Sequence, residues 1–202
     1  MSADLERQLR SLWEQQQYDE VATQALEHHG PPILGLLIKM LRDPVAGSEA
    51  FSMFCEDLWK GLPHFQWRSS LRTWLFTLAR NAAFRMQGQG ARRPERNLPL
   101  DQSPRVLEVI ERVRTRTLAH LRTESKDEIR DLRSALSPDD QLLLTLRIEQ
   151  RLSWREIAPV TLGDEAADTA AVKRESARLR KRFQLVKEQL RKLATERGLL
   201  DN

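Results

Sequence analysis

The chain consists of stretches with helical periodicity, separated by short stretches rich in proline, glycine and serine. Within the periodic stretches apolar residues recur at steps of three and four, and the sequence lacks the strict alternation of apolar and polar residues that indicates strands. This pattern predicts an all-α fold. The expected helices cover residues 4–16, 18–28, 33–42, 48–60, 71–85, about 107–133, 138–148, 152–158 and 169–193.

Several of these helices have boundary signals in the sequence. Gly30-Pro31-Pro32 predicts a break, with a proline suited to the first turn of the next helix, and Asp43-Pro44 ends that helix. Ser153 and Glu156 have the spacing of a capping box, and their helix is expected to stop at Pro159 or soon after it. The other capping candidates are Ser69, Ser70, Ser137 before Pro138, and Asp168 or Thr169.

The clearest linker follows residue 85. It combines glycine and proline with three arginines: Gly88, Gly90, Arg92, Arg93, Pro94, Arg96 and Pro99. It predicts two small helical bundles joined by a connector. We assign residues 1–17 to an N-terminal helical extension, 18–93 to the first bundle, 94–125 to the connector and 126–195 to the second bundle, and we expect the helix of about 107–133 to be shared between the last two.

The helix expected over residues 71–85 is apolar around most of its circumference and should lie inside a bundle. Its polar residues fall at steps of four, three, one and four, so they form one narrow stripe. They are Thr73, Thr77, Arg80, Asn81 and Arg85. A stripe of this composition beside an apolar face predicts a polar binding partner.

The charge is distributed unevenly along the 202 residues, whose net charge is +4. Residues 1–62 contain five basic and ten acidic side chains, whereas 63–96 contain seven arginines and one glutamate. Residues 173–192 contain nine basic and two acidic side chains. Two separate basic zones predict two contacts with a polyanion, and the acidic first third predicts a different surface.

The sequence argues against several functional classes. Cys55 is the single cysteine, so an intrachain disulfide is excluded and no set of metal thiolates exists. His28 and His29 are adjacent and would face apart on a helix. We find no nucleophile–base pair, metal-ligand spacing or phosphate-binding glycine loop, and we expect neither an enzyme nor a cofactor. No signal peptide or membrane-spanning stretch is evident, so we expect a cytoplasmic protein.

The stretch Thr73-Trp74-Leu75 to Ala79-Arg80-Asn81 resembles the Thr-Trp-Leu-x-x-Ile-Ala-Arg-Asn segment of bacterial sigma factors of the extracytoplasmic-function type, within the sigma-70 family. The resemblance implies that this helix belongs to the domain that opens the promoter. In the family, the preceding loop captures a base flipped out of the minus-10 element. Phe65 is expected in the core and Trp67 as the exposed ring. The predicted minus-10 contacts are Trp67, Arg68, Arg80, Asn81, Arg85, Arg92 and Arg93.

In that family, the helix corresponding to residues 48–60 docks on the coiled-coil clamp of RNA polymerase. Its usual pattern is Ala-Glu-Asp-x-x-Gln-Glu-x-Phe, and here Ser52 and Met53 replace the Gln-Glu pair. The acidic residues could still contact a basic polymerase surface. The predicted polymerase contacts are Glu49, Ser52, Met53, Glu56 and Asp57.

A second resemblance, to the minus-35-reading domain of the same family, covers the C-terminal part of the chain. Its matching segments are Leu136-Ser137-Pro138, residues 152–158, Val172-Lys173, Arg178, Arg180-Lys181 and Phe183. A short capped helix followed by a basic helix is typical of a helix-turn-helix. The predicted minus-35 contacts are Trp154, Arg155, Lys173, Arg174, Ala177, Arg178 and Lys181. Val172 lies 14 positions after Ala158. In the family the corresponding connection spans about ten positions.

These observations lead to one main hypothesis and two alternatives. The main hypothesis is an alternative sigma factor, with a region 2-like domain over 18–93 and a region 4-like domain over 126–195. Its expected partners are core RNA polymerase, duplex and melted promoter DNA, and an anti-sigma factor as a candidate regulator, without a membrane. The alternatives are a dimeric helix-turn-helix regulator that associates through the final helix, and a non-initiating decoy or inhibitor with a sigma-like fold.

Overall fold

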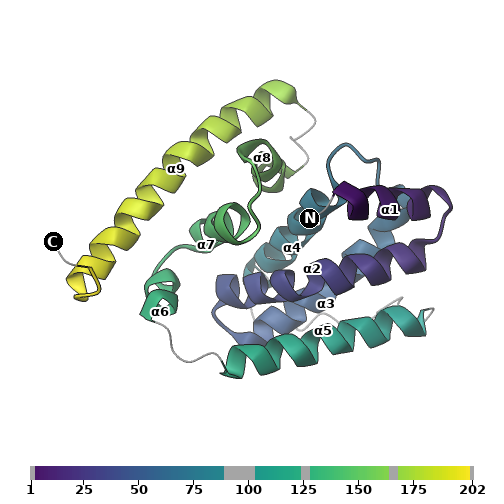
Figure 1. Cartoon of the computed structure of the whole chain (residues 1–202), viewed down its shortest axis with the longest axis horizontal. Coiled ribbons are helices and arrows are strands. Elements are labelled where there is room, and N and C mark those ends of the chain that lie inside the picture. The colour runs from purple at the N-terminus through teal and green to yellow at the C-terminus, as the bar shows by residue number, and fades with distance from the viewer. Residues whose placement is uncertain (1–2, 89–102, 124–127, 164–167, 201–202) are drawn as a thin grey trace. The chain divides into compact units, whose positions relative to one another are not determined.

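The computed structural model describes residues 3–88, 103–123, 128–163 and 168–200, and every regular element in these ranges is helical (Figure 1). The chain divides into two compact units, Met1–Thr123 and Glu124–Asn202, called here the first and second units. The first contains α1 (Ala3–Glu14), α2 (Tyr18–Leu41), α3 (Pro44–Gly61), the 3-10 turn η1 (Leu62–His64), α4 (Leu71–Gly88) and α5 (Pro104–Thr123). The second contains α6 (Glu128–Ser134), α7 (Pro138–Leu144), the π-helical turn η3 (Thr145–Glu149), α8 (Trp154–Leu162) and α9 (Thr169–Glu196).

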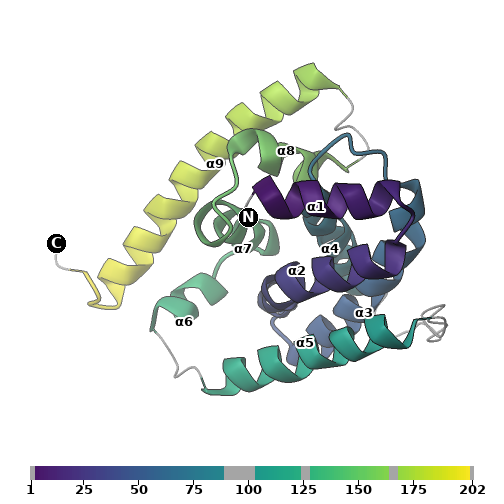
Figure 2. The ribbon, with the colours of Figure 1, turned by 45° about the vertical axis from the view of Figure 1, so that its right-hand side comes forward.

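The first unit is assembled around α2, which contacts each of the other four α-helices of that unit. α1 and α5 lie on opposite sides of α2, as both Figure 1 and Figure 2 show. The core side chains of α2 meet fully buried residues of α3 and α4 such as Phe51, Phe54 and Phe76. Burial of this much apolar surface is the main favourable term in folding.

The structure corrects the prediction of a break near residue 30. α2 is one continuous helix through Pro31 and Pro32, although each proline removes an amide donor from the helix. The helix persists because residues after the prolines, among them Ile33 and Leu37, are fully buried. Gly30 also allows α2 and α5 to approach closely, since a Cβ atom there would lie 3.1 Å from both γ-carbons of Val113 on α5. Tertiary packing therefore outweighs the local break signal.

Most of the predicted caps are confirmed, whereas Ser69 Oγ donates to the Ser70 carbonyl and caps no helix. Ser137 Oγ accepts a hydrogen bond from the Asp140 amide, and Ser153 and Glu156 form the complete capping box. The remaining confirmed caps are Ser70, which accepts from the Thr73 amide, and Asp168, which accepts from the amides of Ala170 and Ala171. α8 ends at Leu162, soon after Pro159, as expected. α3 begins at Pro44, earlier than expected, because Asp43 is its N-cap.

The structure also corrects the placement of the helices at either end of the first bundle. α5 is not shared with the second unit, since Val106, Val109 and Val113 are buried in the first unit against α2. α1 is likewise part of this unit, because Leu9 is completely buried. Two ion pairs, Arg105–Glu20 and Arg112–Glu27, join α5 to α2. The centre of the predicted linker, including Gly90, Pro94, Arg96 and Pro99, lies outside the described residues.

The second unit is held together by the apolar stripe of α9. Val186 packs with Leu136 and Leu144, and Phe183 and Leu190 cover this cluster. This stripe follows from the apolar periodicity of the helix expected over residues 169–193, and it faces inward. Among the described helices of either unit, none is long and apolar enough to cross a bilayer.

Asp140 on α7 anchors α9 through a buried carboxylate that is 2% exposed. Arg182 donates from Nε and Nη2 to the two carboxylate oxygens, each at 2.6 Å, and Ser137 Oγ donates at 2.7 Å. Burial alone would raise the pKa of Asp140, but the hydrogen bonds from Arg182 and Ser137 outweigh it and leave that pKa lowered. The stabilisation from this ion pair is therefore present at neutral pH and is lost as the pH falls through the lowered pKa.

We expect Asp140→Asn to reduce the free energy of unfolding of the second unit by about 1 to 2 kcal/mol at neutral pH, because Arg182 is half exposed and water partly replaces its partner. Urea denaturation followed by circular dichroism measures the change. The difference from wild type should shrink in acid. Asp131→Asn, at an exposed residue of α6, is the control and should be neutral. Equal effects of the two variants would contradict the anchoring role.

Candidate nucleic-acid and polymerase interfaces

The loop between η1 and α4 carries an aromatic cluster. Phe65 is buried, as predicted, and stacks on Trp74 with ring centroids 4.7 Å apart. Trp67 is half buried rather than exposed, with its centroid 5.0 Å from Phe65 and 6.1 Å from Trp13. The Arg10 guanidinium lies 5.6 Å from the Trp67 ring centroid. The ring therefore has partners on α1 that the local sequence did not indicate.

α1 is the part of this site that sequence reasoning missed. Its apolar periodicity predicted a helix but identified no partner for the polar and aromatic residues on it. In the structure Glu6, Arg10 and Trp13 all contact the loop or the start of α4. No motif in the sequence links these positions to Trp67.

The polar stripe of α4 divides into two parts with different roles. Thr73 is buried and accepts a hydrogen bond from Ser70 Oγ, and Thr77 Oγ1 donates to the Thr73 carbonyl at 3.0 Å. These two hydroxyls serve the helix itself. The structure brings the other three residues of the stripe, Arg80, Asn81 and Arg85, to one open cavity of about 510 Å³ with Phe84 and Asp57.

This cavity combines two cations with an aromatic ring. The Arg80 guanidinium lies 4.5 Å from the centroid of Phe84, and Arg85 forms an ion pair with Asp57 of α3. Arginine beside an aromatic face is suited to a nucleotide, because the cation meets phosphate and the ring stacks on a base. Arg68 is exposed on the loop, whereas Arg92 and Arg93 lie outside the described residues.

Four of the five residues predicted to contact polymerase lie on one face of α3. Glu49, Met53, Glu56 and Asp57 are spaced at helical intervals and are all partly exposed. The carboxylates of Glu49, Glu56 and Asp57 form an acidic surface, here called the α3 acidic face. It extends to the Asp57–Arg85 pair and so adjoins the cavity on α4.

The structure contradicts the prediction that Ser52 is an accessible polymerase contact. Ser52 is 8% exposed, donates to the Ser48 carbonyl at 3.2 Å and accepts a hydrogen bond from Arg114 of α5. α5 covers this side of α3 because its apolar face packs on α2 next to it. Ser52, which stands where the family has glutamine, therefore binds other residues of the first unit.

In the second unit, α8 packs against α9. The single hydroxyl proton of Ser176 is shared between the Val172 carbonyl at 2.7 Å and the Trp154 carbonyl at 3.2 Å, and Thr161 Oγ1 donates to Glu175 Oε1 at 2.8 Å. These contacts join the two ends of α8 to α9. The lengthened connection includes residues 164–167, which are not described.

Trp154 is directed into the second unit and is half buried. Its ring meets Phe183 edge-on at 5.4 Å between centroids, and the Arg147 guanidinium lies 4.6 Å from its centroid. The structure therefore gives Trp154 a packing role, in contrast to the predicted DNA contact. The next residue, Arg155, is exposed.

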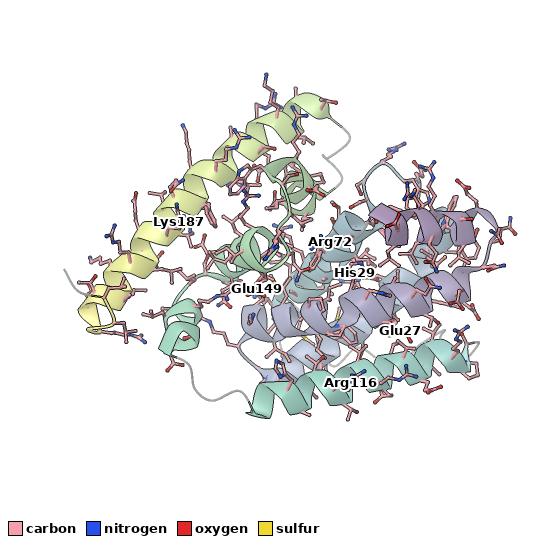
Figure 3. All side chains as sticks on the ribbon, viewed as in Figure 1. Glu27, His29, Arg72, Arg116, Glu149 and Lys187 are labelled. Carbon is pink, nitrogen blue, oxygen red and sulfur yellow. The ribbon has the colours of Figure 1, made fainter. Side chains whose placement is uncertain are left out.

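The exposed face of α9 is strongly basic. Five predicted DNA contacts lie on the side opposite the apolar stripe: Lys173, Arg174, Ala177, Arg178 and Lys181. Arg178 forms two hydrogen bonds with Glu175, each 2.7 Å long, which raise the pKa of the guanidinium. Arg174 is 73% exposed and reaches Asp168 only at 3.5 Å. Further along α9, Lys187 projects near the middle of the helix (Figure 3).

The two adjacent histidines of α2 differ in exposure. His28 is exposed and His29 is buried, so they face apart as expected. Burial, with the charge of nearby Arg72 (both residues are labelled in Figure 3), lowers the pKa of His29 to about 4. The ring is therefore neutral at physiological pH. No cluster of potential metal ligands occurs among the described residues.

Comparison with known families gives a match for part of the first unit. Residues 25–93 match the family model described as Sigma-70 region 2, a range that includes most of α2, all of α3 and all of α4. The comparisons with curated proteins and with solved structures gave no match. Residues 25–93 of the first unit are therefore similar to sigma-70 region 2. This match supports a relation of the first unit to sigma-70 factors, a family with a general role in RNA polymerase binding and promoter recognition.

Proposed function

We propose that the chain is an alternative sigma factor of the extracytoplasmic-function type, which binds core RNA polymerase in the cytoplasm and directs transcription from specific promoters. The observation that carries the proposal is the region 2 match over the helices that present both the α3 acidic face and the cationic cavity of α4. One domain can then contact a basic polymerase surface and DNA at the same time. An anti-sigma factor is a further candidate partner.

In this proposal the first unit binds the melted minus-10 strand. Arg80 and Arg85 line one cavity with Asn81 and are suited to phosphate and base contacts. Arg68 is exposed beside Trp67, whose ring would stack on an unpaired base. Arg92 and Arg93 remain predicted contacts with the minus-10 strand.

The second unit would read the minus-35 duplex through α9. Lys173, Arg174 and Ala177 lie near the start of the helix and would face base edges, because the first residues of a recognition helix enter the major groove most deeply. Arg178 and Lys181 would contact phosphates and add affinity without sequence discrimination. Arg155 on α8 is exposed and would meet the DNA backbone.

Arg174→Ala tests the assignment of base contacts. We expect a loss of about 1 to 3 kcal/mol in binding to the cognate minus-35 duplex, with little loss on a scrambled duplex. Fluorescence anisotropy with the two duplexes measures the difference. The matched control is Lys187→Ala, farther along α9, which should leave the preference unchanged. Equal losses on both duplexes would identify Arg174 as a phosphate contact.

Reconstitution with core RNA polymerase tests the proposed function directly. The chain should co-purify with core enzyme, and the complex should initiate run-off transcription on a subset of genomic fragments. Core binding without initiation would favour a decoy, an alternative supported by the burial of Ser52 beneath Arg114. A stable dimer that binds palindromic DNA without core enzyme would instead identify a helix-turn-helix regulator.

A further inference from the structure

The backbone at Trp67 needs support from its surroundings. Its φ of +53° lies in the left-handed region, which is unfavourable for an aromatic residue. Such conformations persist where neighbouring structure holds them, and they are concentrated at functional sites. Since the indole N–H of Trp67 is buried without a hydrogen-bond partner among the described residues, Trp67 does not hold this conformation through a hydrogen bond of its own ring.

α1 contacts the loop at both of its ends. The indole N–H of Trp13 donates to the Leu62 carbonyl at 2.7 Å, where the loop leaves α3. Glu6 Oε1 accepts a hydrogen bond of 2.6 Å from the amide of Leu71, the first residue of α4. This amide is among those that a helix start leaves without a partner inside the helix. α1 therefore binds the backbone on both sides of the loop, at Leu62 before it and at Leu71 after it.

α1 also contacts the middle of the loop. The Trp13 ring meets Trp67 edge-on with an interplanar angle of 82°, and Arg10 lies over the same indole. Trp13 thus links the start of the loop to the ring proposed to bind a base. The family match begins at residue 25, so none of these α1 residues belongs to the matched range.

Glu6 indicates that polar contacts, in addition to apolar packing, hold α1 against the start of α4. Leu9 already buries α1 against the unit. Burial raises the pKa of Glu6, although the Leu71 amide and the charge of Arg72 oppose that shift, and Glu6 Oε2 has no partner among the described residues. A carboxylate at this position carries a cost in stability. The cost is explained if the hydrogen bond to Leu71 has a positioning role.

We infer that α1 positions the base-capturing loop, with Trp13 and Glu6 as positioning residues at its two ends. This inference rests on the proposed function of Trp67. In the proposed mechanism α1 holds Trp67 in place before DNA arrives, so that a flipped base meets an ordered ring. Ordering the loop in advance lowers the entropic cost of capture.

The test uses holoenzyme reconstituted from core RNA polymerase and the full chain. The probe is a labelled single-stranded oligonucleotide, the non-template minus-10 strand of a promoter identified by run-off transcription. Trp13→Phe keeps an aromatic ring but removes the donor, and we expect about 3- to 10-fold weaker oligonucleotide binding. Affinity for core enzyme and the circular dichroism spectrum of the chain should stay unchanged. Arg7→Ala, on the exposed side of α1, is the matched control.

A double-mutant cycle separates positioning from general support. Trp67→Ala should weaken binding about 10- to 100-fold. Adding Trp13→Phe to that variant should then cause no further loss, because its effect passes through Trp67. Effects that multiply independently would overturn the inference. If Trp67→Ala itself leaves binding unchanged, the proposed role of the loop in DNA binding fails instead.

Glu6 provides a second test at the other end of the loop. Glu6→Ala should weaken oligonucleotide binding, and Glu6→Gln should restore most of it because the amide oxygen can still accept from Leu71. The same rescue should be absent in the Trp67→Ala background. If Trp13→Phe proves unstable, the comparison of Glu6→Ala with Glu6→Gln tests the inference without it. Equal oligonucleotide binding by Glu6→Ala and wild type would overturn the inference.

Discussion

Replacing Gly47 with alanine is expected to lower the free energy of unfolding of the first unit by about 3 kcal/mol. A Cβ atom at this position would lie 2.5 Å from Cγ1 of Ile38 and 2.8 Å from its Cα. The Ile38 side chain could rotate away, but its backbone could not move without separating α2 from α3. The expected cost therefore lies at the upper end of the range for overpacking.

The matched control for this prediction is Gly35→Ala on α2. No atom would lie within 4 Å of a Cβ at Gly35. Alanine has a higher helix propensity than glycine, so this variant should gain up to about 1 kcal/mol in stability. Urea denaturation of the full chain, followed by circular dichroism, measures both. A destabilisation of Gly47→Ala below 1 kcal/mol would show that α2 and α3 can move apart at little cost.

The parts of the fold that could be predicted from sequence are those determined within a few residues. Ser137, Ser153 and Asp168 were identified as caps because a capping side chain and the amide it binds are at most three positions apart. The inward stripe of α9 was identified for a related reason, since helical periodicity alone defines which residues share a face. These signals do not depend on distant parts of the chain.

The errors concern contacts between residues far apart in sequence. Pro31 and Pro32 indicated a break, but the burial that keeps α2 continuous comes from helices elsewhere in the chain. The apolar pattern of α5 predicted a helix without specifying that α2 is its partner. Ser52 was assigned to a surface for the same reason, because only the structure shows Arg114 above it. Periodicity predicts an apolar face but not what covers it.

The aromatic residues of the site show the same limit. Trp67 and Trp154 were both assigned to DNA from the residues around them, and both rings are half buried in their own units. Trp154 packs against Phe183, whereas Trp67 meets Trp13 of a helix outside the matched family range. Residue type indicated stacking in each case. It did not indicate whether the stacking partner is a base or a neighbouring side chain.

The α3 acidic face and the α4 cavity are joined by one ion pair. Asp57 was predicted to bind polymerase and Arg85 to bind DNA, yet in the free chain they bind one another. A substitution of Asp57 would therefore alter both surfaces at once. Glu49 and Glu56 lie on the same face and have no such link to the cavity lining, so they are the better residues for testing polymerase binding alone.

Reversing the charge of both residues, Glu49→Lys with Glu56→Lys, is expected to weaken binding to core RNA polymerase by more than about 100-fold, or roughly 3 kcal/mol. The reason is that two acidic contacts with a basic surface become two like-charge repulsions. Competition binding with labelled wild-type chain measures the affinity. The loss should decrease at high salt, because screening weakens repulsion between partly exposed charges.

The control for the double reversal is Glu14→Lys with Asp19→Lys, which changes the net charge equally at two exposed residues of the first unit. Its affinity for core enzyme should stay within a few-fold of wild type, and both double variants should keep the wild-type circular dichroism spectrum. If the two variants lose affinity equally, net charge and not the α3 acidic face governs association. If neither loses affinity, polymerase docks elsewhere on the chain, and binding by α3 must be abandoned while the role of α4 in DNA binding remains open to its own test.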